Sequence, residues 1–197
     1  RSSEVSRPKD SLVAASHHSS SPRVSPRQAT SGGNKLFLCN RQRKSAVCLK
    51  TLKHHFLAAM DALEITDSEI SLAIVSDKAI AVLHEKWLGI SGPTDVLSFN
   101  LSSTKNAQPS GHGKKHKIHG EIIASAETAS REAHVYSWNA EYELLYYLIH
   151  GLLHLAGYDD QNSLARISMR RKERALMKAI GLPTPPRRRP KTTCYRR

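Results

Sequence analysis

Two histidines separated by one helical turn are the residues of this chain best placed to do chemistry. His150 and His154 stand four positions apart within a leucine-rich run, so both imidazoles lie on one face of a helix. Gly157 ends the run, and Asp159 and Asp160 follow within three residues. The helix and its return loop therefore predict two nitrogens and one oxygen for a single metal ion. A fourth position left open is typical of catalytic zinc sites.

Two aspartates compete for the place of the third metal ligand. Asp160 lies further round the return than Asp159, so we predict that Asp160 is the ligand. We expect Asp159 to accept hydrogen bonds around the ligands, to form the turn, or both. Zinc accepts imidazole nitrogen and carboxylate oxygen, so the expected cofactor is one Zn²⁺ per chain, held by His150, His154 and Asp160. The alternative is that the histidines are buried core residues, each with its own hydrogen-bond partner.

The residue after His150 separates this segment from zinc proteases. Proteases with an H-E-x-x-H motif use the glutamate in that position as the general base. This chain has Gly151 there, which disfavours a peptidase. The other role of zinc remains, because zinc lowers the pKa of bound water to about 7 and supplies hydroxide near neutral pH. In basic surroundings this chemistry suits attack on a phosphodiester.

The basic charge of the chain is concentrated in three segments outside the expected core. Residues 1–34, 104–117 and 183–197 together carry the whole formal net charge of +13, so the remainder of the chain is neutral. Such arms favour a polyanionic partner and bind it in a salt-dependent way. The alternative is that these segments only keep the protein soluble.

Hydrophobic periodicity predicts the elements that position the histidines. The 197 residues suffice for one domain with tails. We predict strands at 36–39, 70–75, 96–99 and 118–124, and helices at 50–63, 77–87, 127–135, 140–156 and 163–180. This mixed order indicates the α/β (α+β) class, with a single small mixed sheet of about four strands packed with helices. The histidine segment is then a zincin-like metal-binding helix.

Capping residues mark the ends of these helices. Asn139 is predicted to cap the start of the histidine helix and Gly157 to end it, while Ser76 caps an earlier helix. Glu143 lies on the same helix face as His150, and we expect it to be a solvated carboxylate rather than a partner of the metal ligands. The residues of the last helix that we expect to be buried are Leu164, Ile167, Leu176 and Ile180.

Composition divides the chain into a domain and two tails. Residues 1–34 hold ten serines and few apolar side chains, which predicts a disordered extension. Residues 35–182 form the expected domain, and residues 183–197 a basic tail rich in proline and arginine. The first segment is also arginine-containing and acid-poor, like an organellar transit peptide. We expect residues 1–34 to be a plain extension of a cytoplasmic protein. If they are a transit peptide, the location is an organelle.

Cysteine usage and hydropathy indicate the cellular environment that suits this chain. Cys39, Cys48 and Cys194 form no C-x-x-C pair and are odd in number, which suits a reducing compartment and argues against a disulfide framework. The longest apolar run is too short to span a bilayer, so no membrane partner is expected.

Three segments resemble the YbeY endoribonucleases, also called rRNA maturation factors. The H-G-x-L-H-L-x-G-Y-D pattern at 150–159 is the most specific of them. The P-T-D-V-L-S-F run at 93–99 matches a family strand. The G-E-I-I run at 120–123 resembles the family's G-D-I-x-I strand, with Glu121 in place of aspartate. Their order and spacing fit the family over about residues 65–181.

The resemblance implies an α/β fold and a zinc ion with three ligands, of which His150 and His154 are the first two. The family usually has a third histidine where this chain has Asp160. The implied activity is zinc-dependent, single-strand-specific endoribonuclease cleavage, in which His150 and His154 act through metal-bound water. The implied role is in 3′-end maturation of 16S-type rRNA and in ribosome quality control. The implied partners are single-stranded rRNA precursor and the small ribosomal subunit.

A second departure from the family concerns RNA binding. The family usually places an arginine where this chain has Leu88, and such an arginine can clamp a phosphate or stabilise developing charge. Lys86 or Arg131 are candidates to replace it, and Lys114 and Lys115 are further candidates for RNA contacts. The departure leaves an alternative function, a non-catalytic ribosome-assembly factor that keeps a structural metal.

Overall fold

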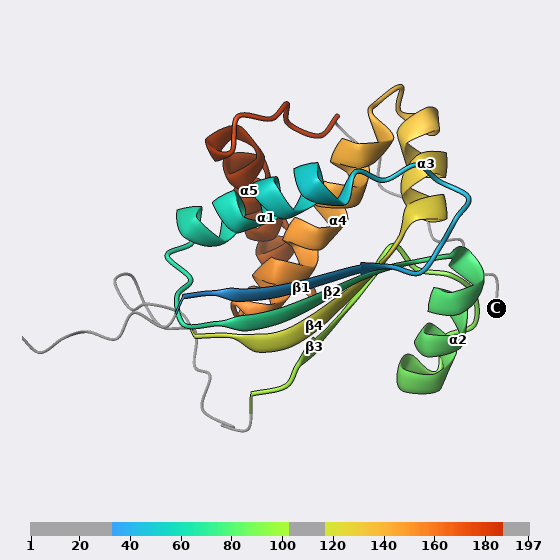
Figure 1. Ribbon diagram of the computed structural model, residues 1–197, viewed down its shortest axis with the longest axis horizontal. Coiled ribbons are helices and arrows are strands. Elements are labelled where there is room, and N and C mark those ends of the chain that lie inside the picture. The colour runs from blue at the N-terminus through green and yellow to red at the C-terminus, as the bar shows by residue number, and fades with distance from the viewer. Residues whose placement is uncertain (1–32, 103–116, 187–197) are drawn as a thin grey trace, which may run out of the picture. The chain divides into compact units, whose positions relative to one another are not determined.

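The computed structural model describes residues 33–102 and 117–186. These residues form a four-stranded sheet and five helices, which confirms the predicted α+β class (Figure 1). The elements follow the predicted order: β1 (Lys35–Asn40), α1 (Leu49–Ala62), β2 (Glu69–Val75), α2 (Asp77–Leu88), β3 (Val96–Asn100), β4 (His119–Ser125), α3 (Ala126–Val135), α4 (Ala140–Leu155) and α5 (Ser163–Ala179).

The sheet is mixed and has the strand order β1-β2-β4-β3. Strands β1, β2 and β4 are parallel, and β3 pairs antiparallel with β4 at the edge. Helices pack on both faces of the two central strands, and both strands accordingly end in four consecutive buried residues. This explains why their sequences are nearly continuous apolar runs rather than alternating ones.

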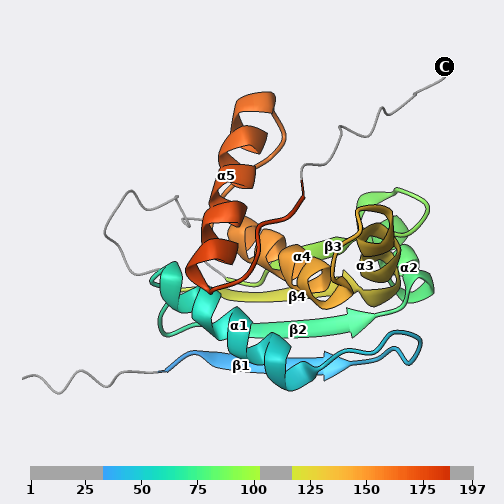
Figure 2. The same cartoon turned by 90° about the horizontal axis from the view of Figure 1, so that it is seen from above.

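Successive residues of β2 point into two separate cores. Ile70, Leu72 and Ile74 belong to the larger core, which the sheet shares with α1, α3, α4 and α5. Ala73 and Val75 belong to a smaller core beneath α2. The strand alternation therefore places α4 and α2 on opposite faces of the sheet, as Figures 1 and 2 show.

Helix α4 lies close against the sheet because two glycines leave room for it. A Cβ atom at Gly151 would stand 2.7 Å from Cγ2 of Ile122 and 3.3 Å from Cγ2 of Val96. A Cβ atom at Gly120 of β4 would stand 2.8 Å from Cδ1 of Leu155. Gly151 therefore faces β3 and β4, which accounts for a glycine beside the first histidine.

The predicted caps of α4 and α2 are confirmed. The Asn139 side chain accepts hydrogen bonds from the backbone of Glu141 and Tyr142, and the Ser76 hydroxyl accepts one from the backbone of Ala79. Gly157 has a φ of 90° just beyond the end of α4, a conformation that favours glycine.

The burial predicted for α5 is wrong at two of four positions. Leu164 and Ile167 are 78% and 57% exposed, whereas Leu176 is buried and Ile180 is half-buried. At 100° per residue, Leu164 and Ile167 lie on the side of α5 opposite the stripe that packs on the core. The buried residues of that stripe are Met169, Glu173, Leu176 and Met177.

Several predictions fall on residues that the structure does not describe. Most of the predicted extension 1–34, Lys114, Lys115 and the tail beyond Pro186 lie outside the described residues. Within the described residues, Cys39 and Cys48 are exposed and form no disulfide. None of the described helices is long and apolar enough to cross a membrane.

Candidate metal centre

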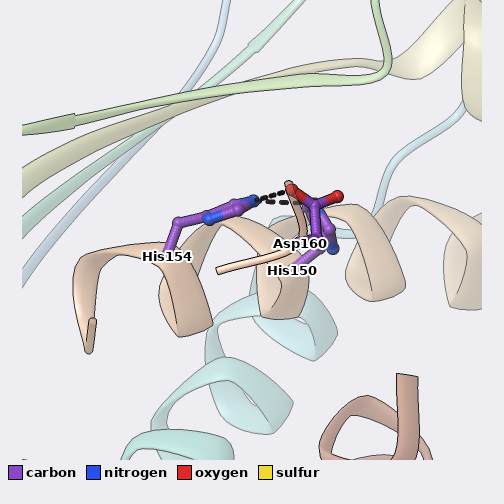
Figure 3. A group of neighbouring side chains, drawn as sticks. All are labelled: His150, His154 and Asp160. Atoms are coloured by element: carbon purple, nitrogen blue, oxygen red, sulfur yellow. Dashed lines mark hydrogen bonds and ion pairs between the residues drawn. The ribbon is translucent and has the colours of Figure 1, made fainter. Parts of the chain in front are cut away.

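The structure brings the three predicted metal ligands together (Figure 3). The Nε2 atoms of His150 and His154 are 3.0 Å apart, and Nε2 of His154 lies 3.9 Å from an Asp160 carboxylate oxygen. All three ligand atoms lie within 4.8 Å of one another. Atoms that bind zinc tetrahedrally at about 2.0–2.2 Å stand about 3.3–3.6 Å apart. The trio therefore fits a zinc ion after small adjustments of the side chains.

Local structure explains how Asp160 reaches the histidines. Gly157 turns the chain back at the end of α4, and the Asp159 carboxylate then accepts hydrogen bonds from the backbone N–H groups of Asp160 and Gln161, at 2.8 and 3.3 Å. From α5, the Arg166 side chain donates to the backbone carbonyl of Asp160 at 3.3 Å. Asp159 thus closes the turn that presents Asp160.

The hydrogen bonds of the other ring nitrogens orient both histidines. Nδ1 of His150 donates to the Glu173 carboxylate at 2.6 Å, and Nδ1 of His154 donates to the backbone carbonyl of Tyr158 at 3.1 Å. Carboxylates and carbonyls only accept, so the proton of each neutral ring resides on Nδ1. The Nε2 lone pairs are then available, and they converge on one point. Two unrelated core histidines have no reason to converge in this way.

Glu173 is the functional residue that the sequence analysis missed. It is 1% exposed, and its second carboxylate oxygen accepts a hydrogen bond from the Tyr146 hydroxyl. Burial by itself would lower the pKa of His150, but the hydrogen bond to Glu173 and the charge of Glu173 outweigh burial and raise it. One signal was present in the sequence: Glu173 is the only acid of α5 and lies on the stripe of its buried residues.

The prediction that Glu143 is a solvated carboxylate is wrong. Glu143 is fully buried, because α4 is covered by the sheet, α1, α3 and α5. Glu143 lies in the first turn of α4, where the positive end of the helix dipole favours an acidic side chain.

The metal trio borders a cleft of about 350 Å³. Its lining includes His150 and Asp160 of the trio, Asp95 before β3, two tyrosines of α4 and several side chains of α5. A substrate in this cleft would therefore lie directly beside the metal ligands.

The other predicted RNA-binding residues lie elsewhere. Lys86 stands near the end of α2, with its amino group 5.4 Å from the centre of the Trp87 ring. Arg131 of α3 forms an ion pair with Asp77 at 2.7 Å. Neither is among the described residues that line the cleft. Leu88 stands where the family that the sequence resembles usually has arginine, and it is 58% exposed.

Comparison with known proteins identifies the family. The family model described as Endoribonuclease YbeY matches residues 37–181, most of the chain. The chain belongs to the YbeY family. This confirms the resemblance seen in the three sequence segments, and the match extends upstream of them to β1.

Individual YbeY proteins are similar over much of their length. An Endoribonuclease YbeY of Desulfitobacterium hafniense (strain Y51) is 40% identical over 119 residues, which cover 60% of this chain and 76% of the relative. One from Moorella thermoacetica (strain ATCC 39073 / JCM 9320) is 35% identical over 136 residues, covering 68% of this chain and 87% of the relative.

A solved structure shares the fold. The solution structure of TM1509 from Thermotoga maritima matches with a TM-score of 0.51 and 26% sequence identity. The match covers 74% of this chain and 88% of that chain.

Proposed function

We propose that this YbeY family member is a zinc-dependent endoribonuclease that cleaves single-stranded RNA. The observation that supports the proposal is the convergence of two Nε2 atoms and one carboxylate oxygen beside a cleft. The family model and the curated relatives carry the description endoribonuclease. We further propose a role in 3′-end maturation of 16S-type rRNA and in ribosome quality control.

Each residue of the centre has a distinct task in this proposal. His150, His154 and Asp160 hold the zinc ion. A zinc ion in such a site lowers the pKa of water and supplies hydroxide near neutral pH. Glu173 orients His150 and adds negative charge behind it, which makes the imidazole a better ligand. The Tyr158 carbonyl orients His154 without adding charge.

The proposed partners follow from the same activity. We propose that the substrate is single-stranded rRNA precursor. We further propose that the protein acts at the small ribosomal subunit. The proposed compartment is the cytoplasm, or an organelle if residues 1–34 act as a transit peptide.

The test is cleavage of a single-stranded RNA by the purified full chain. Chelation of zinc and the variants His154→Ala and Asp160→Ala should each abolish cleavage, and added zinc should restore it only in the chelated wild type. The matched control is His134→Ala, because His134 is an exposed histidine at the end of α3. If chelation and His154→Ala both leave the cleavage rate unchanged, the proposal is wrong.

A second candidate function is a non-catalytic ribosome-assembly factor with a structural metal. The observation that favours it is the exposed apolar group Trp87, Leu88 and Ile90 at the end of α2, where an arginine would have suited phosphate. In this case the wild type and His154→Ala should co-sediment equally with small ribosomal subunits, and neither should cleave RNA. If the wild type cleaves RNA and His154→Ala does not, this second candidate function is excluded.

A further inference from the structure

Helix α5 presents three arginines to the cleft beside the metal trio. Arg166, Arg170 and Arg174 follow one another at intervals of four residues, and all three line the same cleft as His150 and Asp160. Four residues advance a helix by about 6 Å, which is close to the distance between neighbouring phosphates of one nucleic-acid strand. The three arginines therefore repeat along α5 at about the spacing of a phosphate backbone.

Within the described part of the chain, the positive charge of these arginines is not neutralised by ion pairs. The only acid of α5 is Glu173, which is buried and bound to His150 and Tyr146. No carboxylate among the described residues forms an ion pair with Arg166, Arg170 or Arg174. Arg166 donates to the backbone carbonyls of the turn after α4, at 3.3 and 3.5 Å.

The charge balance of the cleft favours an anion. Its acidic lining residues are Asp95, Asp160 and Glu173, which equal the three arginines in number. A divalent metal ion on Asp160 then leaves the cleft with a net positive charge. A guanidinium group binds a phosphate through two parallel hydrogen bonds, so a row of arginines holds successive phosphates at fixed positions.

We propose that Arg166, Arg170 and Arg174 form an arginine track that binds consecutive phosphates of single-stranded RNA and lays the strand beside the metal trio. The proposal rests on the proposed function and adds to it the surface that selects and positions the substrate. The track differs from the RNA contacts predicted at Lys86 and Arg131, which do not line the cleft.

The test compares two arginines of the track with one beside it. The double variant Arg170→Gln/Arg174→Gln leaves Arg166 in place, because Arg166 also holds the Asp160 turn. The control is Arg171→Gln, since Arg171 is an exposed arginine of the same helix and does not line the cleft. Binding of a short single-stranded RNA to the full chain is measured at several salt concentrations, once with zinc bound and once with a chelator, which prevents zinc-dependent cleavage.

The double variant should bind roughly tenfold more weakly or worse, and the slope of log affinity against log salt should fall by about 1.4, or about 0.7 per lost phosphate contact. Arg171→Gln should stay close to the wild type. Arg170→Lys/Arg174→Lys keeps the charge, so it should keep the salt slope while losing part of the affinity. Equal zinc content in all variants would show that the metal trio is intact.

The outcomes separate this proposal from the proposed function. If the double glutamine variant binds RNA with the affinity and salt slope of Arg171→Gln, the arginine track is wrong, even where cleavage depends on zinc. If cleavage ignores the chelator but the salt slope falls as expected, the track stands and the zinc-dependent mechanism is wrong.

Discussion

At the scale of single residues, the two candidate metal-binding histidines, His150 and His154, differ in the hydrogen-bond acceptor of their Nδ1 atoms. His150 donates to a buried carboxylate, whereas His154 donates to a backbone carbonyl. The carboxylate adds charge as well as orientation, so Glu173 should strengthen zinc binding more than the Tyr158 carbonyl does. The most informative single substitution is therefore one that removes the charge of Glu173 and keeps its shape.

We expect Glu173→Gln to weaken zinc binding by about tenfold and Glu173→Ala by up to about 100-fold, because alanine removes the orienting acceptor as well as the charge. Competition for zinc with a coloured chelator measures both affinities. Glu64→Gln is the control, since Glu64 is exposed in the turn after α1 and distant in sequence from the metal ligands. Equal zinc affinity of Glu173→Gln and the wild type would contradict the role given to the charge.

At the scale of elements, the metal centre depends on how closely α4 approaches the sheet and on how α5 packs against α4. Gly151 permits the first contact, and Glu173 with its apolar neighbours makes the second. The hydrogen bonds of Asp77 tie α2, on the other face of the sheet, to the start of α3, because the Asp77 carboxylate accepts from Ser125, Thr128 and Arg131.

Replacing Gly151 with alanine should destabilise the protein although alanine favours helices. The new Cβ atom would stand 2.7 Å from Cγ2 of Ile122, a buried β-branched side chain with little freedom to move. Overpacking costs about 1–3 kcal/mol, and the gain in helix propensity offsets about 1 kcal/mol of it. Urea unfolding should therefore show a net loss of up to about 2 kcal/mol.

Two comparisons check the cause of that loss. Gly33→Ala should be neutral, because no atom lies within 4 Å of the added Cβ. In Gly151→Ala/Ile122→Ala the losses should be less than additive, since the second substitution removes the clashing methyl group. Additive losses would show that the clash is not the cause.

The Asp77 contacts make a pH-dependent contribution to stability. Burial by itself would raise the pKa of Asp77, but hydrogen bonds from Ser125, Thr128 and Arg131 lower it below its ordinary value. A carboxyl whose pKa is lowered by folding stabilises the protein above its unfolded pKa of about 3.9, and this contribution is lost as pH falls through the folded pKa.

Asp77→Asn should therefore reduce the free energy of unfolding by about 1–2 kcal/mol at pH 7, and the difference from the wild type should shrink below about pH 4. Urea unfolding of both proteins between pH 7 and pH 3 measures the difference. Asp61→Asn, an exposed position of α1, serves as the control. A difference that is independent of pH would show that the Asp77 charge is not responsible.

At the scale of the whole molecule, the metal centre joins parts that are distant in the chain. Its ligands come from α4 and the following turn, its supporting carboxylate from α5, and a wall of its cleft from the segment before β3. Since the folded chain assembles these groups, the proposed zinc ion should bind the folded state in preference to the unfolded chain.

Zinc should accordingly stabilise the whole domain. At a free zinc concentration 100 times the dissociation constant, the free energy of unfolding should rise by about 2.7 kcal/mol. Urea unfolding with zinc and with chelator measures the difference, and His154→Ala should abolish it. An equal increase in His154→Ala would show that the ion binds outside the trio.

The sequence by itself determined the features that depend on local spacing. The order of the elements, the Asn139 cap and the Gly157 turn are set within a few residues, and so is the nearness of His150 and His154. A helix places positions i and i+4 together whatever surrounds it.

The packing of α4 and α5 decided the rest. Glu173 reaches His150 from 23 residues away, Glu143 is buried although its side chain is polar, and Leu164 is exposed although it is apolar. The arginine track lines the same cleft as His150 and Asp160 because it runs alongside the stripe of α5 that packs on the core. Periodicity shows that a helix has two sides, but which neighbour covers each side depends on contacts between segments far apart in the chain, and only the tertiary structure contains them.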